Sequence, residues 1–254
     1  MKRENKIFNW RFFLGLFLVS VSAALYYLHY VIFHDAHHIF IYLLGDIAFI
    51  PAEVLLVTLI IHHMLEKHEK KARMKKLNML VGVFFSDTGT PLLRVFTEFD
   101  KHAPGLRDRL NIAGQWPENE FADVMAFLRK RSYEIETSAV KLENLRGFMC
   151  SKMDLLLNLL ANPNVLEQER FTELLWAVLH LAEELSNRKS FKDLPGTDHE
   201  HLSGDIKRAY VLLIERWVEY MRHLKADYPY LFSLAVRTNP FIPDQQVIVG
   251  PARV

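Results

Sequence analysis

The sequence predicts an all-α protein in which a two-helix transmembrane hairpin is followed by a cytoplasmic α-helical bundle. Of the 254 residues, 31 are Lys or Arg, yet none lies between Arg11 and Lys67, a gap of 55 residues. A globular domain does not show such a gap. Beyond it, apolar residues recur at helical spacing and strand signals are nearly absent. These patterns exclude a purely soluble protein, a disordered chain, a disulfide scaffold and a polytopic transporter.

The hairpin is expected at residues 12–64, after a cytoplasmic flank of residues 1–11. Residues 12–33 form an apolar run that spans about 33 Å as a helix, enough to cross a bilayer. Residues 39–61 are long enough for a second crossing. The connection at residues 34–38 is so short that the two helices must run antiparallel.

The distribution of Lys and Arg predicts the orientation of the hairpin. Cationic residues flank both crossings on one side, whereas the connecting turn has none. The positive-inside rule then places both termini in the cytoplasm and the turn outside the membrane. The second flank is also expected to contact anionic headgroups through Lys67, Lys70, Lys71, Arg73, Lys75 and Lys76. A cleaved signal peptide is the competing interpretation of the first run, but its apolar residues continue without pause to Phe33.

Residues 65–240 are expected to form a helical cytoplasmic domain. Pro91 suits a first helical turn, a helix is expected after Pro117, and Asn164 starts another with Glu167 as its capping-box partner. A break in the chain is expected at residues 86–91, and Cys150 is expected in the core. The remaining helices are predicted over residues 77–84, 92–99, 121–128, 138–161, 202–224 and 229–239. The tail, residues 241–254, is expected to be extended or disordered, with 246–249 as the one candidate strand.

Two acidic residues, Asp46 and Glu53, lie within the second crossing. Seven residues make about two helical turns, so both acids share one face. Counted from the turn, Asp46 lies at the depth of Tyr26 and His29, and Glu53 near Ser20. Either Asp46 pairs with these groups and pins the hairpin, or several copies place the acids around a pore. Both interpretations favour a homo-oligomer, because one hairpin cannot shield both acids from lipid.

Two groups of residues have metal-ligand spacing. The predicted turn holds His34, Asp35, His37 and His38, and His34 with His38 would chelate a divalent metal if the turn were helical. His180 and Glu184 are also four residues apart, and the next helix start carries Asp198, His199, Glu200, His201 and Asp205. Together these would make a metal site from two helices, although solvated faces and helix caps are the commoner role of such residues.

Other features bound the function. Residues 77–254 carry 21 Lys and Arg against 24 Asp and Glu, which argues against nucleic-acid binding. The sequence has no phosphate-binding glycine loop, nucleophile elbow or CxxC motif. The chain is therefore expected not to be an enzyme and to need no resident cofactor; an enzyme with a helical metal site is the third alternative.

Two stretches resemble those of uncharacterised bacterial inner-membrane proteins with two crossings and a helical cytoplasmic region. They are GDIAFIPAEVLLVTLIIHHM (residues 45–64) and YPYLFSLAVRTNPF (residues 228–241). The resemblance implies a location in a bacterial inner membrane, and it implies no activity. The expected function is thus a membrane-anchored, oligomeric protein whose cytoplasmic domain binds a protein partner or senses a signal. The alternative is an oligomeric cation channel in which the second crossing lines an acidic pore.

Overall fold

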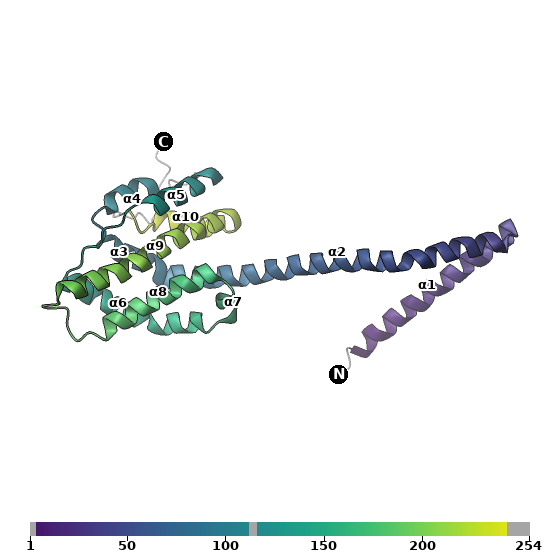
Figure 1. Ribbon diagram of the computed structural model, residues 1–254, viewed down its shortest axis with the longest axis horizontal. Helices are drawn as coiled ribbons and strands as arrows, with labels where there is room; N and C mark the ends of the chain where they lie inside the picture. The colour runs from purple at the N-terminus through teal and green to yellow at the C-terminus, as the bar shows by residue number, and fades with distance from the viewer. Residues whose placement is uncertain (1–3, 112–115, 243–254) are drawn as a thin grey trace. The chain divides into compact units, whose positions relative to one another are not determined.

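The computed structural model describes residues 4–111 and 116–242, and over these residues the protein is all-α (Figure 1). It divides into two compact units, Met1–Lys70 and Lys71–Val254. Helix α2 (Ala36–Phe84) belongs to both, since its last residues lie in the second unit. The boundary therefore falls inside a helix and not in a linker.

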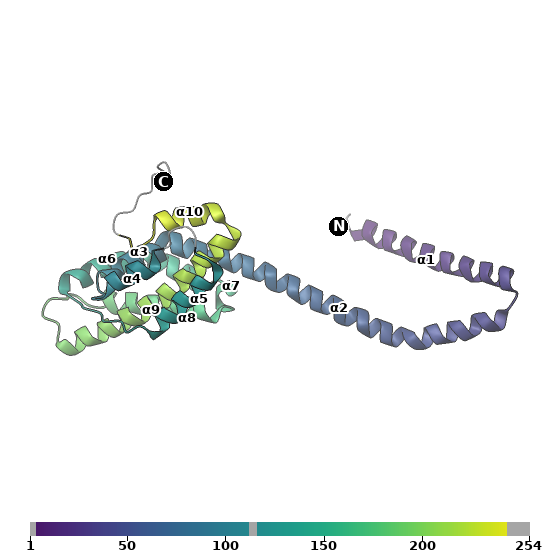
Figure 2. The same cartoon turned by 90° about the horizontal axis from the view of Figure 1, so that it is seen from above.

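The first unit consists of α1 (Glu4–Phe33) and the beginning of α2, which meet at a tight turn and spread apart away from it (Figures 1 and 2). Only His34 and Asp35 lie between the helices, so the predicted five-residue turn is too long. His34 has a positive φ of 51°, and the Asp35 carboxylate accepts a hydrogen bond from the His38 N–H at 3.1 Å. Asp35 thus acts as the N-cap of α2, which begins at the next residue, Ala36, and includes His37.

Two helices of the described chain are long and apolar enough, by length and composition, to cross a membrane. None of the residues in their most apolar windows is buried within the chain. We call residues 12–33 and 39–61 the apolar hairpin. Helix α2 is longer than the apolar segment within it. It is not interrupted at Pro51, and beyond residue 61 it continues through the basic run (residues 67–76) to Phe84.

The second unit is a helical domain with its own core. In both views α9 (Gly196–Asp227) runs through it, and α8 (Glu169–Ser186), α5 (Glu118–Lys130), α3 (Thr90–Thr97) and α10 (Pro229–Arg237) pack on α9 (Figures 1 and 2). Helix α6 (Ala139–Leu160) packs on α8, and α4 (Ala103–Leu110) and α7 (Pro163–Leu166) are short. The end of α2 contributes Leu77, Val81 and Phe84 to the core.

Several predicted helix ends are confirmed. Pro91 lies in the first turn of α3, Pro117 precedes α5, and Ser138 caps α6 by accepting from the Lys141 N–H. The capping box at Asn164 is wrong. Asn162 caps the short α7 instead, since its side chain accepts from the Asn164 N–H at 3.0 Å, and α8 begins only at Glu169.

The predicted break at residues 86–91 is also wrong, because the chain stays helical there as the π-helix η1 (Phe85–Gly89). A π-turn adds one residue to the helical register, so it rotates the side chains that follow. Phe84 and Phe85 both become completely buried, and the Phe85 ring stacks on Tyr220 of α9 with centroids 4.8 Å apart. The polar cluster at this point thus changes the direction of the helix face without ending the helix.

Two further expectations need correction. Cys150 is exposed on α6, because the inward face of that helix is formed by its neighbour Met149 and by Leu145. The tail is not extended from its first residue, since the Phe241 ring is buried against Trp217 with centroids 5.2 Å apart. The candidate strand at residues 246–249 lies outside the described residues.

Candidate functional site

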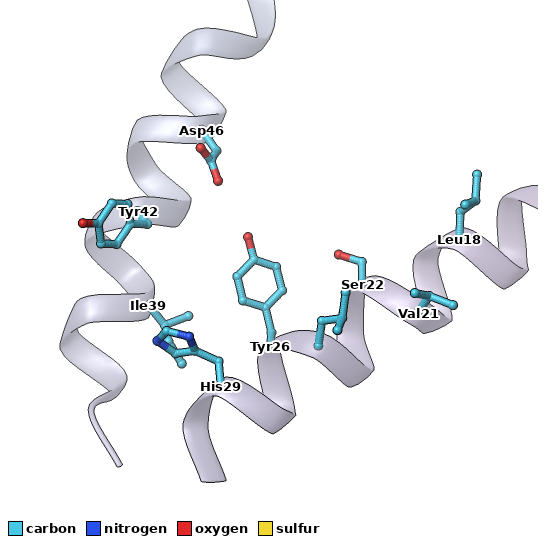
Figure 3. A pocket seen from close by; sticks show the side chains of 9 residues that line it. Leu18, Val21, Ser22, Tyr26, His29, Ile39, Tyr42 and Asp46 are labelled. Carbon is cyan, nitrogen blue, oxygen red and sulfur yellow. The ribbon is translucent and has the colours of Figure 1, made fainter. Parts of the chain in front are cut away.

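Several polar residues of the apolar hairpin line a cavity of about 540 Å³ between α1 and α2 (Figure 3). Asp46 lies on the α2 side, and the Tyr26 hydroxyl points across the cavity toward its carboxylate. His29 lines the end nearer the turn. Tyr26, His29 and Asp46 thus line the same cavity. The rest of the wall is mostly apolar and comprises Leu18, Val21, Leu25, Ile39 and Tyr42.

His29 also takes part in a row of aromatic rings that ends at the turn. Its ring is parallel to that of His38 with centroids 6.4 Å apart, and it contacts Phe33 at 4.7 Å. On the other side, His38 meets Tyr42 edge to face at 4.8 Å. Only the His29–His38 pair joins the two helices, because the other two pairs lie within α1 and within α2.

Glu53 and Ser20 do not join this cavity. Ser20 donates its hydroxyl hydrogen to the Leu16 carbonyl one turn earlier, at 2.8 Å, so its hydrogen bond stays within α1. Ser22 is the cavity residue that sequence reasoning missed. The helical period contained the signal, because Ser22, Tyr26 and His29 follow one another at steps of four and three residues.

The turn does not have the geometry expected of a chelating helix. His34 lies outside α2, so His34 and His38 are not one helical turn apart on a common face. One oxygen of Asp35 is engaged in the cap described above. As the side chains stand, no group of three or more His, Cys, Asp or Glu residues in the described chain is placed to hold a metal ion.

The basic run lies on α2 with its side chains in solvent. Arg73 forms an ion pair at 3.8 Å with Glu167, which follows α7. Both partners are more than half exposed, so this pair adds little stability. The other five members of the run are exposed as well: Lys67, Lys70, Lys71, Lys75 and Lys76.

The second unit carries a groove of about 830 Å³ between the end of α2, α9 and α10. One wall is polar: His223 Nδ1 lies 3.3 Å from the Asn78 amide nitrogen and 2.8 Å from the Asp227 carboxylate. The remaining wall is mostly apolar and includes Met79 and Val83, which are 61% and 50% exposed, although Ser86 and Asp87 also line it. An apolar groove with a polar edge has the composition of a binding site.

Comparisons with known proteins give relatives for both parts of the chain. A family described as "MJ1433, N-terminal helical domain" matches residues 4–65. A second, "Uncharacterized protein MJ1433, C-terminal helical domain", matches residues 73–237. The chain is 41% identical over 228 residues to the uncharacterized protein MJ1433 of Methanocaldococcus jannaschii, an alignment that covers 90% of this chain and 92% of that protein. No solved structure matches the chain. The sequence resemblance points to bacterial proteins, whereas this relative is archaeal.

Proposed function

The chain belongs to the uncharacterised MJ1433 family of proteins with N- and C-terminal helical domains, and from this premise we propose that it is a membrane-anchored interaction or sensing protein. The apolar hairpin is its membrane anchor. The second unit is the domain that binds a partner or a signal on the cytoplasmic side. The family description assigns no activity, so the proposal depends on the residues of this chain.

The exposure of the apolar hairpin carries the proposal. Its large side chains lie in the open, with Phe13 63% and Leu56 60% exposed, whereas Leu174, Leu213 and many others in the second unit are completely buried. Water would penalise so many exposed apolar side chains by roughly 25 cal/mol for each Å². A lipid bilayer removes that penalty and also accepts helices, whose backbone hydrogen bonds are all internal.

The single cysteine gives a direct test of this arrangement. Cys150 is the only cysteine in the sequence and is exposed on the second unit. In cells that express the protein, a membrane-impermeant maleimide should label Cys150 only after the cells are permeabilised. In the variant His37→Cys/Cys150→Ser, the same reagent should label the turn in intact cells.

Alkaline carbonate washing supplies the control for this experiment, because it strips peripheral proteins from membranes. The full chain should stay in the membrane pellet. Release of the protein by carbonate would contradict the membrane anchor. Labelling of Cys150 in intact cells would contradict the proposed orientation.

We also propose that the anchored protein is a homo-oligomer. A single hairpin leaves Asp46 and Glu53 exposed, and an acidic side chain at membrane depth is costly unless protein or water surrounds it. A second hairpin would supply that cover. Light scattering of the purified protein in detergent should give a protein mass of at least two chains; a mass of 29.7 kDa would contradict this proposal.

The groove beside His223 is the surface we propose for the partner. Its apolar wall suits an amphipathic helix, and its polar edge would fix the orientation of the bound segment. Exchange of Val83 for Asp should weaken capture of the partner without unfolding the domain, because Val83 is half exposed. The same exchange at Val140, which is 71% exposed and lies outside the groove, is the matched control.

A cation channel remains the second candidate because of the cavity beside Asp46. In an oligomer, this cavity could face a common axis. The Asp46 carboxylates of the copies would then line a pore, and a ring of carboxylates favours the passage of cations. Liposomes containing the wild-type protein should then pass K⁺ faster than liposomes containing Asp46→Asn. Equal flux at the level of empty liposomes in both preparations would remove the channel and leave the anchor proposal unaffected.

A further inference from the structure

Helices α8 and α9 bring four metal-binding side chains together on the second unit. His180 and Glu184 are one turn apart on α8, and His201 and Asp205 are one turn apart on α9. The two helices pack against each other, so both pairs face the same region. The neighbours Asp198 and His199 are directed elsewhere, to Arg188 and Thr137.

The Asp205 carboxylate is the centre of this cluster. Its side chain is only 5% exposed, and its Oδ2 is completely buried without a hydrogen-bond partner. His201 Nε2 lies 3.4 Å from this oxygen and His180 Nε2 lies 3.6 Å from it. Both separations exceed the length of an N–H···O hydrogen bond. A buried carboxylate oxygen without a hydrogen bond is expensive, and here two imidazole nitrogens lie within ion-pair distance of it but beyond hydrogen-bond length.

The separations between these atoms suit ligands of one ion. Two ligands on a tetrahedral zinc, with bonds of about 2.0 Å, are about 3.3 Å apart. Glu184 completes the set, because its Oε2 lies 3.5 Å from His201 Nε2 and its Oε1 lies 4.0 Å from His180 Nε2. We propose that His180, Glu184, His201 and Asp205 bind a divalent first-row transition-metal ion, with Zn²⁺ as the expected occupant.

Two arginines orient the carboxylates from outside the cluster. Arg208 donates to Asp205 Oδ1 at 3.3 Å, which leaves Oδ2 directed at the histidines. Arg188 donates to Glu184 Oε2 at 2.7 Å, which leaves Oε1 for an ion. Such outer partners are usual around metal ligands, since they fix the geometry of the coordinating group.

Binding requires the side chains to close around the ion, since no three of them are already placed to hold it. The backbone positions need not change, because each pair is already one helical turn apart on a packed helix. The two histidines are 46% and 50% exposed and have room to rotate, and Glu184 is 28% exposed. Four protein ligands would leave no open position on a tetrahedral ion, as in structural zinc sites, although here carboxylates take the place of the usual cysteines. The ion would then clamp α8 to α9.

The test uses the full chain, purified in detergent and stripped with a chelator. Zn²⁺ titration with a competing chromophoric chelator should find one tight site per chain. In His180→Ala/His201→Ala the affinity should fall at least about 100-fold, beyond the effect of losing an outer partner. Co²⁺ should give the intense visible absorption of a tetrahedral site in the wild type and not in the variant.

Three further variants test whether the metal binds at this cluster. His102→Ala removes an exposed histidine that also pairs with a glutamate, and it should leave the affinity unchanged. His34→Ala/His38→Ala should also leave it unchanged; loss of binding only in that variant would place the metal at the turn and overturn the proposal. Asp205→Asn keeps the size of the side chain and the contact with Arg208, so it should weaken binding while the domain stays folded.

Thermal melting gives a readout that does not depend on titration. Zn²⁺ should raise the Tm of the wild type, since a ligand that binds only the folded state stabilises it. The melting temperature of His180→Ala/His201→Ala should not respond to Zn²⁺. Equal Zn²⁺ affinity in the wild type and this variant would overturn the proposal. None of these outcomes depends on whether the hairpin enters a membrane.

Discussion

Arg131 donates a hydrogen bond to the Asp100 carboxylate at 3.0 Å, and the two side chains are only 9% and 0% exposed. Arg131 also donates to the His102 carbonyl at 2.6 Å and lies over the Tyr133 ring at 5.0 Å. Burial raises the pKa of this tyrosine to about 12. The ion pair joins two irregular segments, which also meet at the isolated bridge between Asp100 and Ile135.

Removal of Arg131 should therefore destabilise the second unit severely. Arg131→Met leaves the Asp100 carboxylate buried without its cation, and breaking a buried pair costs about 3–5 kcal/mol. Urea unfolding followed by tryptophan fluorescence would measure the loss. Lys101→Met breaks a neighbouring but exposed pair with Glu134 and should change the midpoint little. Equal midpoints for the two variants would show that burial does not govern this pair.

Gly89 should not tolerate a side chain. A Cβ at this position would lie 2.7 Å from the Phe85 ring and 2.9 Å from the Phe84 ring, and both rings are completely buried. Gly89→Ala should therefore cost about 1–3 kcal/mol, as overpacking of a core does. Gly147→Ala is the matched control, since nothing lies within 4 Å of the added Cβ. That exchange lies inside α6 and should stabilise the domain by up to about 1 kcal/mol.

Asn239 should be essential for the position of the chain after α10. It is completely buried, its amide donates to the Leu110 carbonyl at 2.7 Å, and its carbonyl accepts from the Phe241 N–H at 3.0 Å. Asn239→Ala leaves both backbone groups unpaired, at a cost of about 1–3 kcal/mol each. The Tm of the full chain should fall accordingly. Asn158→Ala, on the exposed face of α6, should leave the Tm nearly unchanged.

The stability of the second unit should fall in acid because of Asp198. The Arg188 guanidinium donates to its two oxygens at 2.7 and 2.9 Å and lowers the pKa of this carboxyl. The stabilisation is present above the unfolded pKa of about 3.9 and is lost as the pH falls through the lower folded value. Asp198→Asn should lower the free energy of unfolding at pH 7 by about 1–3 kcal/mol.

Measurements at several pH values distinguish this pair from a general charge effect. The difference between wild type and Asp198→Asn should shrink as the pH falls below about 4, where the unfolded carboxyl becomes protonated. Asp154→Asn, in an exposed position on α6, should show no such trend. A difference that stays constant from pH 7 to pH 3 would contradict the role of the ionised carboxylate.

Much of the helical architecture follows from apolar spacing and from prolines. Pro229 marks the start of α10, because proline favours a first helical turn and its missing N–H costs nothing there, and Pro117 directly precedes α5. The π-helix was not predictable from residues 86–91, since polar and small residues are equally typical of a loop. Its cause is the packing of Phe84 and Phe85, which depends on residues far away in sequence, such as Tyr220.

The candidate sites differ in how far local pattern determines them. Tyr26, His29 and Asp46 come together because a short turn joins two antiparallel helices. Residues at similar distances from the turn then lie opposite each other, so counting residues from the turn is enough to pair them. The role of Asp35 could not be assigned from composition, because an aspartate can be a metal ligand or a helix cap. The position of the His38 N–H, which donates to its carboxylate, shows that it caps α2. For Asp205, spacing suggested a ligand, but its burial depends on how α8 and α9 pack.

The shared helix α2 has a consequence for how the second unit begins to fold. The first core residue of that unit, Leu77, lies well inside α2, so the helix does not start at the domain boundary. A chain cut near Lys71 would leave four backbone N–H groups at the cut without partners, and it would have to form the costly first turn of the helix anew. In the intact chain the residues before Lys71 belong to the same helix, so these N–H groups have partners. Removal of residues 36–70 should therefore weaken the first helical segment of the second unit.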